Sequence, residues 1–373
     1  MVADLPKLAD PAQLERDLLD SRARATRATA GLDGERLLGP RLAIVNPPLW
    51  EIGHVAWFQE RWCLRQRADG SLGDSILPGA DALYDSSAVA HDTRWDLPLP
   101  DLEATRAYGA RVLELTRERL AREPASEALQ YFVRLATFHE DMHAEAFLYT
   151  RQTLGYPRPD FDFGPMDSQS GDRSKGDIEL AGGTFMLGAT PADGFVFDNE
   201  KWAHAVELAA FRIAHAPVGN AEYLEFVEQG GAAPRYWKKQ DGAWAERRFD
   251  RWLPLAPDAP VRHVSWDEAQ AYCAWSKRRL PTEAEWERAA SAGEISPSAG
   301  LWEWTASSFA PYPGFVPDPY KEYSAPWFGT HKVLRGASFA TPARLARPKF
   351  RNFYTPDRAD IFAGFRTCAI GRG

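Results

Sequence analysis

Residues 157–176 read PRPDFDFGPMDSQSGDRSKG, and this stretch divides the chain of 373 residues into two parts of different texture. It consists mainly of Pro, Gly, Asp and Ser with almost no aliphatic side chains, which is typical of a linker. A chain of this length is expected to form about two domains. We therefore expect a first domain over residues 1–160, a linker over 161–176 and a second domain over 177–373.

Before the linker, apolar residues recur at spacings of three and four, as in Leu14 with Leu18 and Val112 with Leu115. This period is typical of amphipathic helices that bury one face. Pro and Gly interrupt the pattern and separate the helices. The first part is predicted to be a helical bundle, with helices near residues 10–32, 46–66, 101–122 and 126–154.

After the linker, short β-like runs alternate with Gly and Pro, and three helical patterns interrupt them. The last of these begins at Thr282, with Glu285 three residues later, which predicts a capping box. The second part is therefore expected to be α+β, and the whole chain to have the fold class α + (α+β). The expected strands are residues 178–180, 184–187, 206–213 and 332–334, and the expected helices are 220–228, 265–277 and one from 282.

The charge balance excludes several kinds of partner. With 44 Lys and Arg against 52 Asp and Glu, the net charge is -8, so no strong attraction to nucleic acid or to anionic lipid is expected. No apolar run approaches the roughly 18–20 residues of a membrane span, and no signal peptide is evident. We expect a cytoplasmic protein that binds neither nucleic acid nor membrane. The cysteines Cys63, Cys273 and Cys368 are too dispersed for a disulfide framework and are expected to be reduced.

Histidines on two of the predicted helices suggest a metal site. His139 and His143 lie four residues apart and therefore share a helix face, and His54 lies on another helix of the same bundle. Facing helices of a bundle commonly assemble metal sites in this way. Three imidazoles leave open positions that suit iron(II), but they suit zinc as well.

The segment from His139 to His143 also matches the H-E-x-x-H pattern of zinc proteases, with Glu140 as the general base. The metzincin continuation of that pattern is absent, because Ala146 and Tyr149 replace its Gly and its third His. A zinc hydrolase is therefore kept only as an alternative. The five remaining histidines lack a partner at ligand spacing and are expected to be structural or superficial: His91, His204, His215, His263 and His331.

The second part resembles the formylglycine-generating-enzyme (sulfatase-modifying factor) fold, which is a C-type-lectin-like domain. The motifs that carry this resemblance occur in order at residues 182–188, 217–223, 264–269, 279–287, 302–305, 333–339 and 364–366. Most of these positions look like determinants of the fold, with Gly in turns, Trp in the core and Arg–Glu pairs inside. Formylglycine generation depends on a reactive cysteine pair, and residues 344–354 contain no cysteine, which counts against that activity.

A helical domain with three histidines ahead of this fold resembles the ergothioneine-type sulfoxide synthases, non-haem iron enzymes built from a DinB-like bundle plus this domain. The resemblance spans nearly the whole chain, and it implies that His54, His139 and His143 bind Fe(II). It further implies dioxygen and hercynine (trimethylhistidine) as substrates, with a bond formed between the imidazole C2 of hercynine and a chalcogen donor.

The same resemblance assigns roles to residues of the second part. Tyr320 and Tyr323 match the tyrosine pair of the family, and the first is similar to its active-site acid. Asn352 matches the residue that contacts hercynine. Phe353 is placed to face the trimethylammonium as a cation–π partner.

Three further positions bear on the donor. Tyr354 stands where the family members that use γ-glutamylcysteine carry an Asp. In the same enzymes a polar residue precedes the second histidine ligand of the helix, and here Met142 replaces it. Residues 84–96 match the segment that carries the thiol-binding arginines of the family, and Arg94 is the one obvious cation left there. A lining of this kind suits a neutral polyol better than a dianionic dipeptide. The pattern resembles the selenoneine-forming branch, which joins hercynine to a selenosugar (1-seleno-glucose).

Two alternatives stay open beside selenoneine synthesis. One is ergothioneine-type synthesis with cysteine or γ-glutamylcysteine as the thiol donor. The other is a non-catalytic binding module, since lectin-like folds often only bind and fold alone does not decide function.

Overall fold

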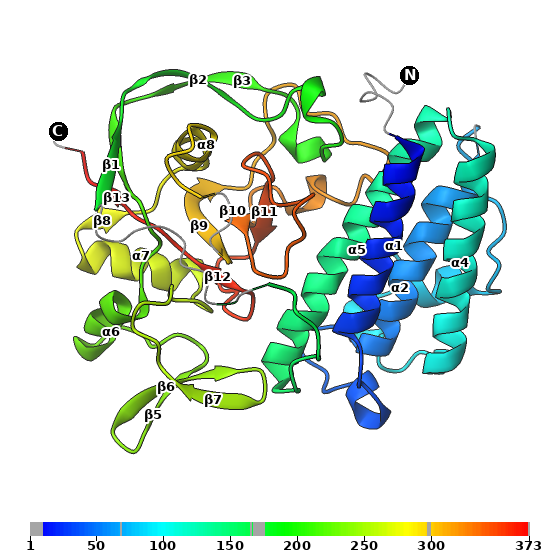
Figure 1. Cartoon of the computed structure of the whole chain (residues 1–373), viewed down its shortest axis with the longest axis horizontal. Helices are drawn as coiled ribbons and strands as arrows, with labels where there is room; N and C mark the ends of the chain where they lie inside the picture. The colour runs from blue at the N-terminus through cyan, green and yellow to red at the C-terminus, as the bar shows by residue number, and fades with distance from the viewer. Residues whose placement is uncertain (1–9, 68, 165, 167–175, 297–299, 372–373) are drawn as a thin grey trace. The chain divides into compact units, whose positions relative to one another are not determined.

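The computed structural model describes residues 10–67, 69–164, 166, 176–296 and 300–371. The chain divides into two compact units (Figure 1), one formed by residues 1–154 and 158–161 and the other by residues 155–157 and 162–373. Most of the expected linker, at positions 165 and 167–175, lies outside the described residues.

The first unit is a helical bundle, as predicted. Asp10 and Asp101 cap two of its helices by accepting backbone N–H bonds through their side chains. The expected helix over 46–66 is α-helical only to Glu60 and continues as a single π-helical turn over Arg61–Arg65. The helices are α1 Pro11–Ala28, α2 Pro48–Glu60, the short α3 Ala80–Tyr84, α4 Leu102–Arg122 and α5 Glu127–Leu154.

Helix α2 is the most deeply buried element of the bundle: every residue in it except Ile52 is buried. A helix that is buried on all sides needs its polar groups paired within the protein. Arg22 of α1 provides one such connection, because its guanidinium donates to Gln59 of α2 at 2.7 Å, to the carbonyl of Gly109 in α4 at 2.7 Å and to Glu140 of α5 at 2.5 Å. The guanidinium of Arg22 thus links all four long helices, α1, α2, α4 and α5.

The second unit is α+β, as predicted, and its short strands form several sheets. The order in one sheet is β1-β4-β13-β8 and in another β11-β10-β9-β12, in which β12 pairs with β9 in parallel; β2-β3 and β5-β6-β7 form smaller sheets. The strands are β1 Asp177–Leu180, β2 Gly183–Leu187, β3 His204–Leu208, β4 Phe211–Ala214, β5 Trp237–Gln240, β6 Ala243–Arg248, β7 Arg251–Pro254, β8 Arg278–Arg279, β9 Leu301–Ser308, β10 Lys332–Ala337, β11 Asn352–Tyr354, β12 Ala363–Gly364 and β13 Cys368–Ala369.

The helices of this unit are α6 Asn220–Glu228, α7 Trp266–Trp275 and α8 Glu283–Ser291, close to the expected positions. The capping box at Thr282 and Glu285 is present, as predicted. The prediction of a single strand over 206–213 was wrong. The chain leaves β3 after Leu208 and joins a different sheet as β4. Gly182 allows this change of sheet, since a Cβ there would lie 2.7 Å from the carbonyl oxygen of Leu208.

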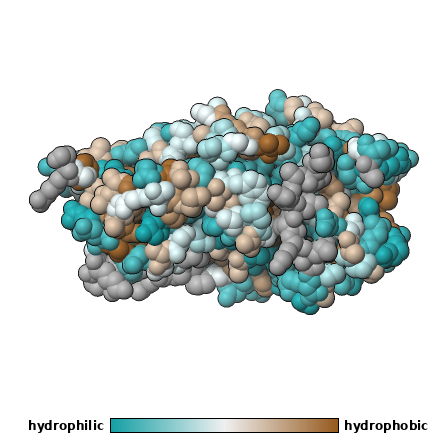
Figure 2. Space-filling view, turned by 90° about the horizontal axis from the view of Figure 1, so that it is seen from above, coloured by the Kyte–Doolittle hydropathy of each residue, from teal (hydrophilic) through white to brown (hydrophobic). Residues whose placement is uncertain are grey.

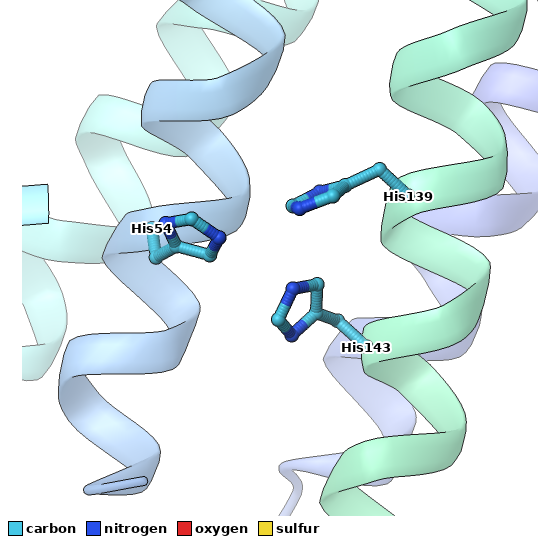
Figure 3. Close-up of side chains that lie close together, drawn as sticks. All are labelled: His54, His139 and His143. Carbon is cyan, nitrogen blue, oxygen red and sulfur yellow. The ribbon is translucent and has the colours of Figure 1, made fainter. Parts of the chain in front are cut away.

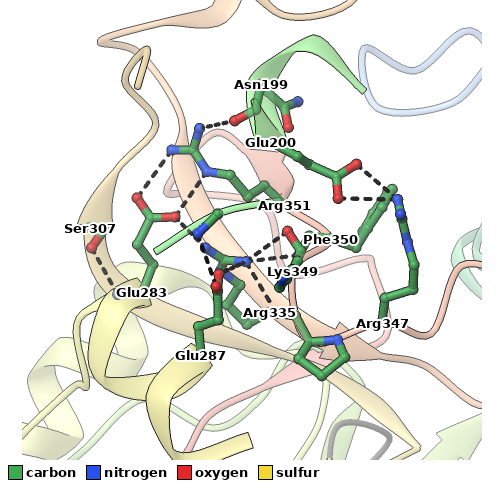
Figure 4. A network of polar contacts seen from close by, with 12 residues as sticks. Asn199, Glu200, Glu283, Glu287, Ser307, Arg335, Arg347, Lys349, Phe350 and Arg351 are labelled. Carbon is green, nitrogen blue, oxygen red and sulfur yellow. Dashed lines mark hydrogen bonds and ion pairs between the residues drawn. The ribbon is translucent and has the colours of Figure 1, made fainter. Parts of the chain in front are cut away.

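A buried ionic network joins α8 to β10 and to the segment before β11 (Figure 4). Arg335 of β10 bonds to Glu283 at 2.8 Å and lies 3.1 Å from Glu287, and Arg351 also binds Glu283, at 2.9 Å. The side chains of Arg335, Arg351 and Glu287 are completely buried. Removal of one partner would leave an unpaired buried charge, which typically costs about 3–5 kcal/mol. The predicted internal Arg–Glu pairs therefore hold this unit together.

Among the described residues, no helix is both long enough and apolar enough to cross a bilayer. On the face seen in Figure 2, hydrophilic and hydrophobic side chains are interspersed.

Candidate metal centre

Helices α2 and α5 bring the three predicted histidines together. Their rings point toward one another across the space between the two helices (Figure 3), and one ligand nitrogen of each lies within 4.8 Å of those of the other two. The ring centroid of His54 is 5.1 Å from that of His139 and 5.1 Å from that of His143. His139 and His143 are one turn apart on α5, with centroids 4.4 Å apart.

Two of the rings are oriented by hydrogen bonds to their Nδ1 atoms. His54 Nδ1 donates to the carbonyl of Tyr84 at 2.8 Å, and His143 Nδ1 lies 2.5 Å from Oε1 of Glu51, which is buried. With the proton on Nδ1, the lone pair is on Nε2 and is available to a metal. A metal-bound histidine almost always has such an outer partner. Glu51 was not singled out in the sequence, although it lies one helical turn before His54.

Aromatic rings fix the planes of the two most buried imidazoles. Trp50 stacks on His54 with centroids 4.9 Å apart and planes 9° apart, and Phe58 stacks on His139 at 3.6 Å and 6°. Trp50 and Phe58 each lie four residues from His54 on α2, one turn to either side. These rings exclude water from two sides of the site and reduce the rotational freedom of the ligands.

The electrostatics of the site favour neutral imidazoles at His54 and His139. Burial, followed by the charge of the neighbouring His143, lowers the pKa of both His54 and His139 well below the ordinary value. A metal ligand must be unprotonated, so a site that resists protonation is partly prepared for the ion. The three nitrogen donors fit a divalent transition metal and leave coordination positions open, as a catalytic ion requires.

Glu140 does not face this site as a protease base would. Its side chain is buried and pairs with Arg22, which also binds α2 and α4. This carboxylate therefore serves the packing of the bundle. The H-E-x-x-H pattern matches by residue type only, and the zinc-hydrolase alternative loses its general base.

Arg94 and Met142, expected near the donor, are also in the first unit. The guanidinium of Arg94 lies 4.0 Å over the ring of Trp50, on which His54 stacks. It donates to Oδ1 of Asn46 at 2.6 Å and to the carbonyl of Val89 at 3.2 Å. Met142 is half-buried on α5 directly before His143. The side chain of Arg94 is thus paired within the first unit, and the residue is only 8% exposed.

In the second unit, Tyr320, Tyr323 and Phe353 belong to one aromatic cluster. Tyr323 lies 5.9 Å from Tyr320 and 5.7 Å from Phe353, measured between ring centroids. Burial, followed by the nearby carboxylates of Glu200 and Asp198, raises the pKa of Tyr323 well above its ordinary value. This phenol therefore keeps its proton across the physiological range.

Sequence reasoning missed other members of this cluster. Phe197 stacks on Tyr323 at 4.2 Å, Phe309 stacks on Phe353 at 4.0 Å, and His331 lies 5.8 Å from Phe353. They come from segments far apart in the chain, so no spacing rule connects them. The aromatic richness of the second part was the one available signal.

Asn352 and Tyr354 flank Phe353 on β11, which pairs with β10. Oδ1 of Asn352 accepts a hydrogen bond from the backbone N–H of Phe353 at 2.9 Å. The ring of Tyr354 lies 4.9 Å from the guanidinium carbon of Arg358. Both side chains are half-buried.

Comparison with known proteins agrees with this architecture. Residues 17–147 match the DinB superfamily, and residues 163–299 and 298–370 match the sulfatase-modifying factor enzyme 1-like domain. The chain is 32% identical to the hercynine oxygenase of Mycolicibacterium thermoresistibile over 95% of this chain and 94% of that protein. It is 30% identical to the hercynine oxygenase of Mycobacterium tuberculosis, over 96% and 99%.

The formylglycine-generating enzyme of Streptomyces coelicolor is 26% identical, over 52% of this chain and 89% of that enzyme. Fold and site together define a DinB-like bundle with three clustered histidines, followed by a formylglycine-generating-enzyme-like domain. The chain belongs to the ergothioneine-type sulfoxide synthase family.

Proposed function

We propose that this protein is an iron(II)- and dioxygen-dependent enzyme that joins a chalcogen donor to C2 of the hercynine imidazole. The observation that carries the proposal is the convergence of His54, His139 and His143, with two of the rings held by Tyr84 and Glu51. Relatives that bear the name hercynine oxygenase share almost the full length of the chain, and this supports hercynine as the substrate.

In this proposal the three histidines would hold the iron, and His54 and His143 would use Nε2 because their Nδ1 atoms are bonded to Tyr84 and Glu51. Bound iron(II) supplies the redox chemistry through which dioxygen oxidises the two coupling partners. Glu51 and the Tyr84 carbonyl keep the ligand rings in place, and Trp50 and Phe58 keep water away from them.

Residues of the second unit take the roles that the resemblance assigns. Tyr320 donates a proton, with Tyr323 as its neighbour, and Asn352 and Phe353 bind hercynine. The aromatic surroundings of Phe353 suit a trimethylammonium group, because quaternary ammonium ions are bound by aromatic faces. The raised pKa of Tyr323 means that this neighbour of Tyr320 stays neutral.

We further propose that the preferred donor is a selenosugar such as 1-seleno-glucose. Arg94, the one cation expected to meet a carboxylate of a thiol donor, is bonded to Asn46 and to backbone carbonyls and is mostly buried. Tyr354 lacks the negative charge that would pair with the ammonium of an amino acid. Both features favour a neutral donor over cysteine or γ-glutamylcysteine.

The test is anaerobic reconstitution with iron(II), followed by air, with hercynine and four competing donors: selenoglucose, thioglucose, cysteine and γ-glutamylcysteine. Mass spectrometry identifies the adducts, and an anaerobic sample is the control. We expect a hercynine–selenosugar adduct as the main product, formed only with dioxygen. A cysteine-containing sulfoxide as the main product would refute the selenosugar assignment, and no oxygen-dependent adduct would favour a binding module.

A further inference from the structure

Two segments of the second unit, residues 195–201 and 318–324, make contact at both ends of the tyrosine pair. The segment 318–324 carries Tyr320 and Tyr323 and contains no strand. The segment 195–201 contains a short 3-10 helix, η6 Asp198–Glu200. Neither segment contributes a residue to the roles proposed so far except the two tyrosines.

At the first end, Lys201 binds Asp318. Its Nζ lies 2.7 Å from each carboxylate oxygen, and the side chains of Lys201 and Asp318 are 19% and 21% exposed. This pair is largely shielded from solvent, so it is less screened than a surface salt bridge. Asp318 lies two residues before Tyr320.

At the second end, Ser324 is held by two side chains. Its hydroxyl donates to Oδ1 of Asp198 at 2.5 Å and accepts from Nδ2 of Asn199 at 3.1 Å. All three residues are almost fully buried. Ser324 directly follows Tyr323, whose ring stacks on Phe197 of the same opposing segment. Residues 318–324 therefore contact residues 195–201 at three places: before Tyr320, at Tyr323 and directly after Tyr323.

Residues 195–201 are themselves bonded to the buried ionic network (Figure 4). Arg351 donates to the carbonyl of Asn199 at 2.7 Å and also binds Glu283 of α8. Arg347 donates to the carbonyl of Phe195 at 2.8 Å and pairs with Glu200 at 2.9 Å. Residues 195–201 are thus a rigid support rather than a free loop.

The support contains a carboxylate that is unfavourable for stability. Burial raises the pKa of Asp198 to about 6, although a hydrogen bond from Ser324, a backbone hydrogen bond from Asp318 and the charge of Lys201 favour the carboxylate. Perturbed ionisable groups of this kind cluster at functional sites. A neutral side chain at this position would be easier to bury.

We propose that Asp198, Asn199, Lys201, Asp318 and Ser324 are positioning residues, which hold Tyr320 and Tyr323 in one orientation for proton donation. This inference rests on the proposed function, since it assumes that the tyrosine pair takes part in the coupling reaction. The five residues touch no substrate in this account; they act through the segment that carries the tyrosines.

The variant Lys201→Met removes the ion pair with Asp318, and Ser324→Ala removes the hydrogen bonds to Asp198 and Asn199. The variant Lys201→Arg keeps the positive charge. The matched control is Lys349→Met, because Lys349 forms a comparable pair with Asp193, at 2.9 Å and with side chains 27% and 30% exposed. The full-length protein, reconstituted with iron(II), is assayed with hercynine and the donor that the wild type prefers. Turnover, the share of consumed dioxygen recovered as coupled product, iron content and Tm are measured together.

We expect kcat to fall about 10- to 100-fold in Lys201→Met and Ser324→Ala. The coupled share of dioxygen should fall with kcat, while iron content stays unchanged. Lys201→Arg should recover most of the activity, and Lys349→Met should retain it. Wild-type kcat and coupling in both Lys201→Met and Ser324→Ala would overturn the proposal, and so would an equal loss in Lys349→Met.

A second measurement is independent of turnover. Tyrosine nitration by tetranitromethane, mapped by mass spectrometry, reports the accessibility of Tyr320 and Tyr323. Their nitration should be several-fold faster in Lys201→Met and Ser324→Ala than in the wild type or Lys349→Met. Unchanged nitration in both variants would refute the positioning role even if the wild type showed no turnover. Faster nitration in the two variants, together with a wild type that shows no oxygen-dependent coupling, would refute the proposed function alone.

Discussion

Replacement of Glu51 by Gln should weaken metal binding without unfolding the bundle. The carboxylate accepts from His143 Nδ1 at 2.5 Å, and its side chain is only 2% exposed, so the hydrogen bond forms in a water-poor environment. A charged acceptor strengthens such a bond about twofold and makes the ligand ring more basic. Loss of an outer partner of this kind typically lowers metal affinity about 10- to 100-fold, or about 1.4–2.7 kcal/mol.

The assay is an anaerobic titration of the metal-free protein with iron(II), followed by calorimetry or by competition with a chelator. Glu60→Gln is the matched control, because Glu60 is also buried on α2 but accepts from Tyr108 and Ser75 instead. This control should lower stability and leave the metal affinity unchanged. Wild-type affinity in Glu51→Gln would refute the role of the carboxylate, and an equal loss in both variants would show that the effect is general.

Three further predictions concern packing, pH and thiol reactivity. Gly53→Ala should destabilise the first unit by about 1–3 kcal/mol and weaken metal binding, because a Cβ would lie 2.3 Å from the ring of Tyr84, whose carbonyl holds His54; urea unfolding and metal titration measure both effects, and unchanged values would contradict this packing. The pKa of Asp198 is raised from 3.8 to about 6, so the folded state favours the protonated acid: its stability contribution is complete below pH ~4 and is lost as the pH rises through 6, about 3 kcal/mol in all. Asp198→Asn should therefore gain stability over the wild type between pH 4 and 7, and a constant difference across that range would exclude this titration. Burial raises the pKa of the Cys63 thiol, and it raises the pKa of the Cys273 and Cys368 thiols to about 12. A thiol reagent at pH 8 should therefore label none of the three before denaturation; rapid labelling of the folded protein would contradict their burial.

Local patterns in the sequence were informative where the structure is local. The i, i+4 spacing of His139 and His143 places them on one face of a helix, and the capping box at Thr282 depends on residues within one turn. The addition of His54 required only that two bundle helices face each other. These features follow from helix geometry, which short sequence windows contain.

Features that depend on distant residues were not predictable. Glu51 and His143 are 92 positions apart, and only the fold brings them together. The three-residue offset between Glu51 and His54 was a usable signal, because it places both on one face of α2. The sheet β5-β6-β7 was missed because its strands are rich in Lys, Arg and Glu and lack a clear apolar alternation.

The aromatic cluster shows the same limit. The motif match led to Tyr320, Tyr323 and Phe353, but Phe197 and Phe309 come from separate segments and have no mutual spacing. Arg94 was expected to face a donor, and its bonds to Asn46 and Val89 could not be read from its neighbours in the sequence. Side-chain pairing across loops depends on tertiary structure.

Hercynine-dependent dioxygen uptake by the iron-reconstituted protein tests the central claim most directly. Wild type and His143→Ala are compared, with His91→Ala as a control, since His91 bonds to the carbonyl of Val45 outside the cluster. The account predicts that wild type and His91→Ala consume dioxygen only when iron(II), hercynine and a chalcogen donor are all present, and that His143→Ala remains folded but consumes none. Undiminished uptake by His143→Ala, or no uptake by the wild type with any donor, would contradict it.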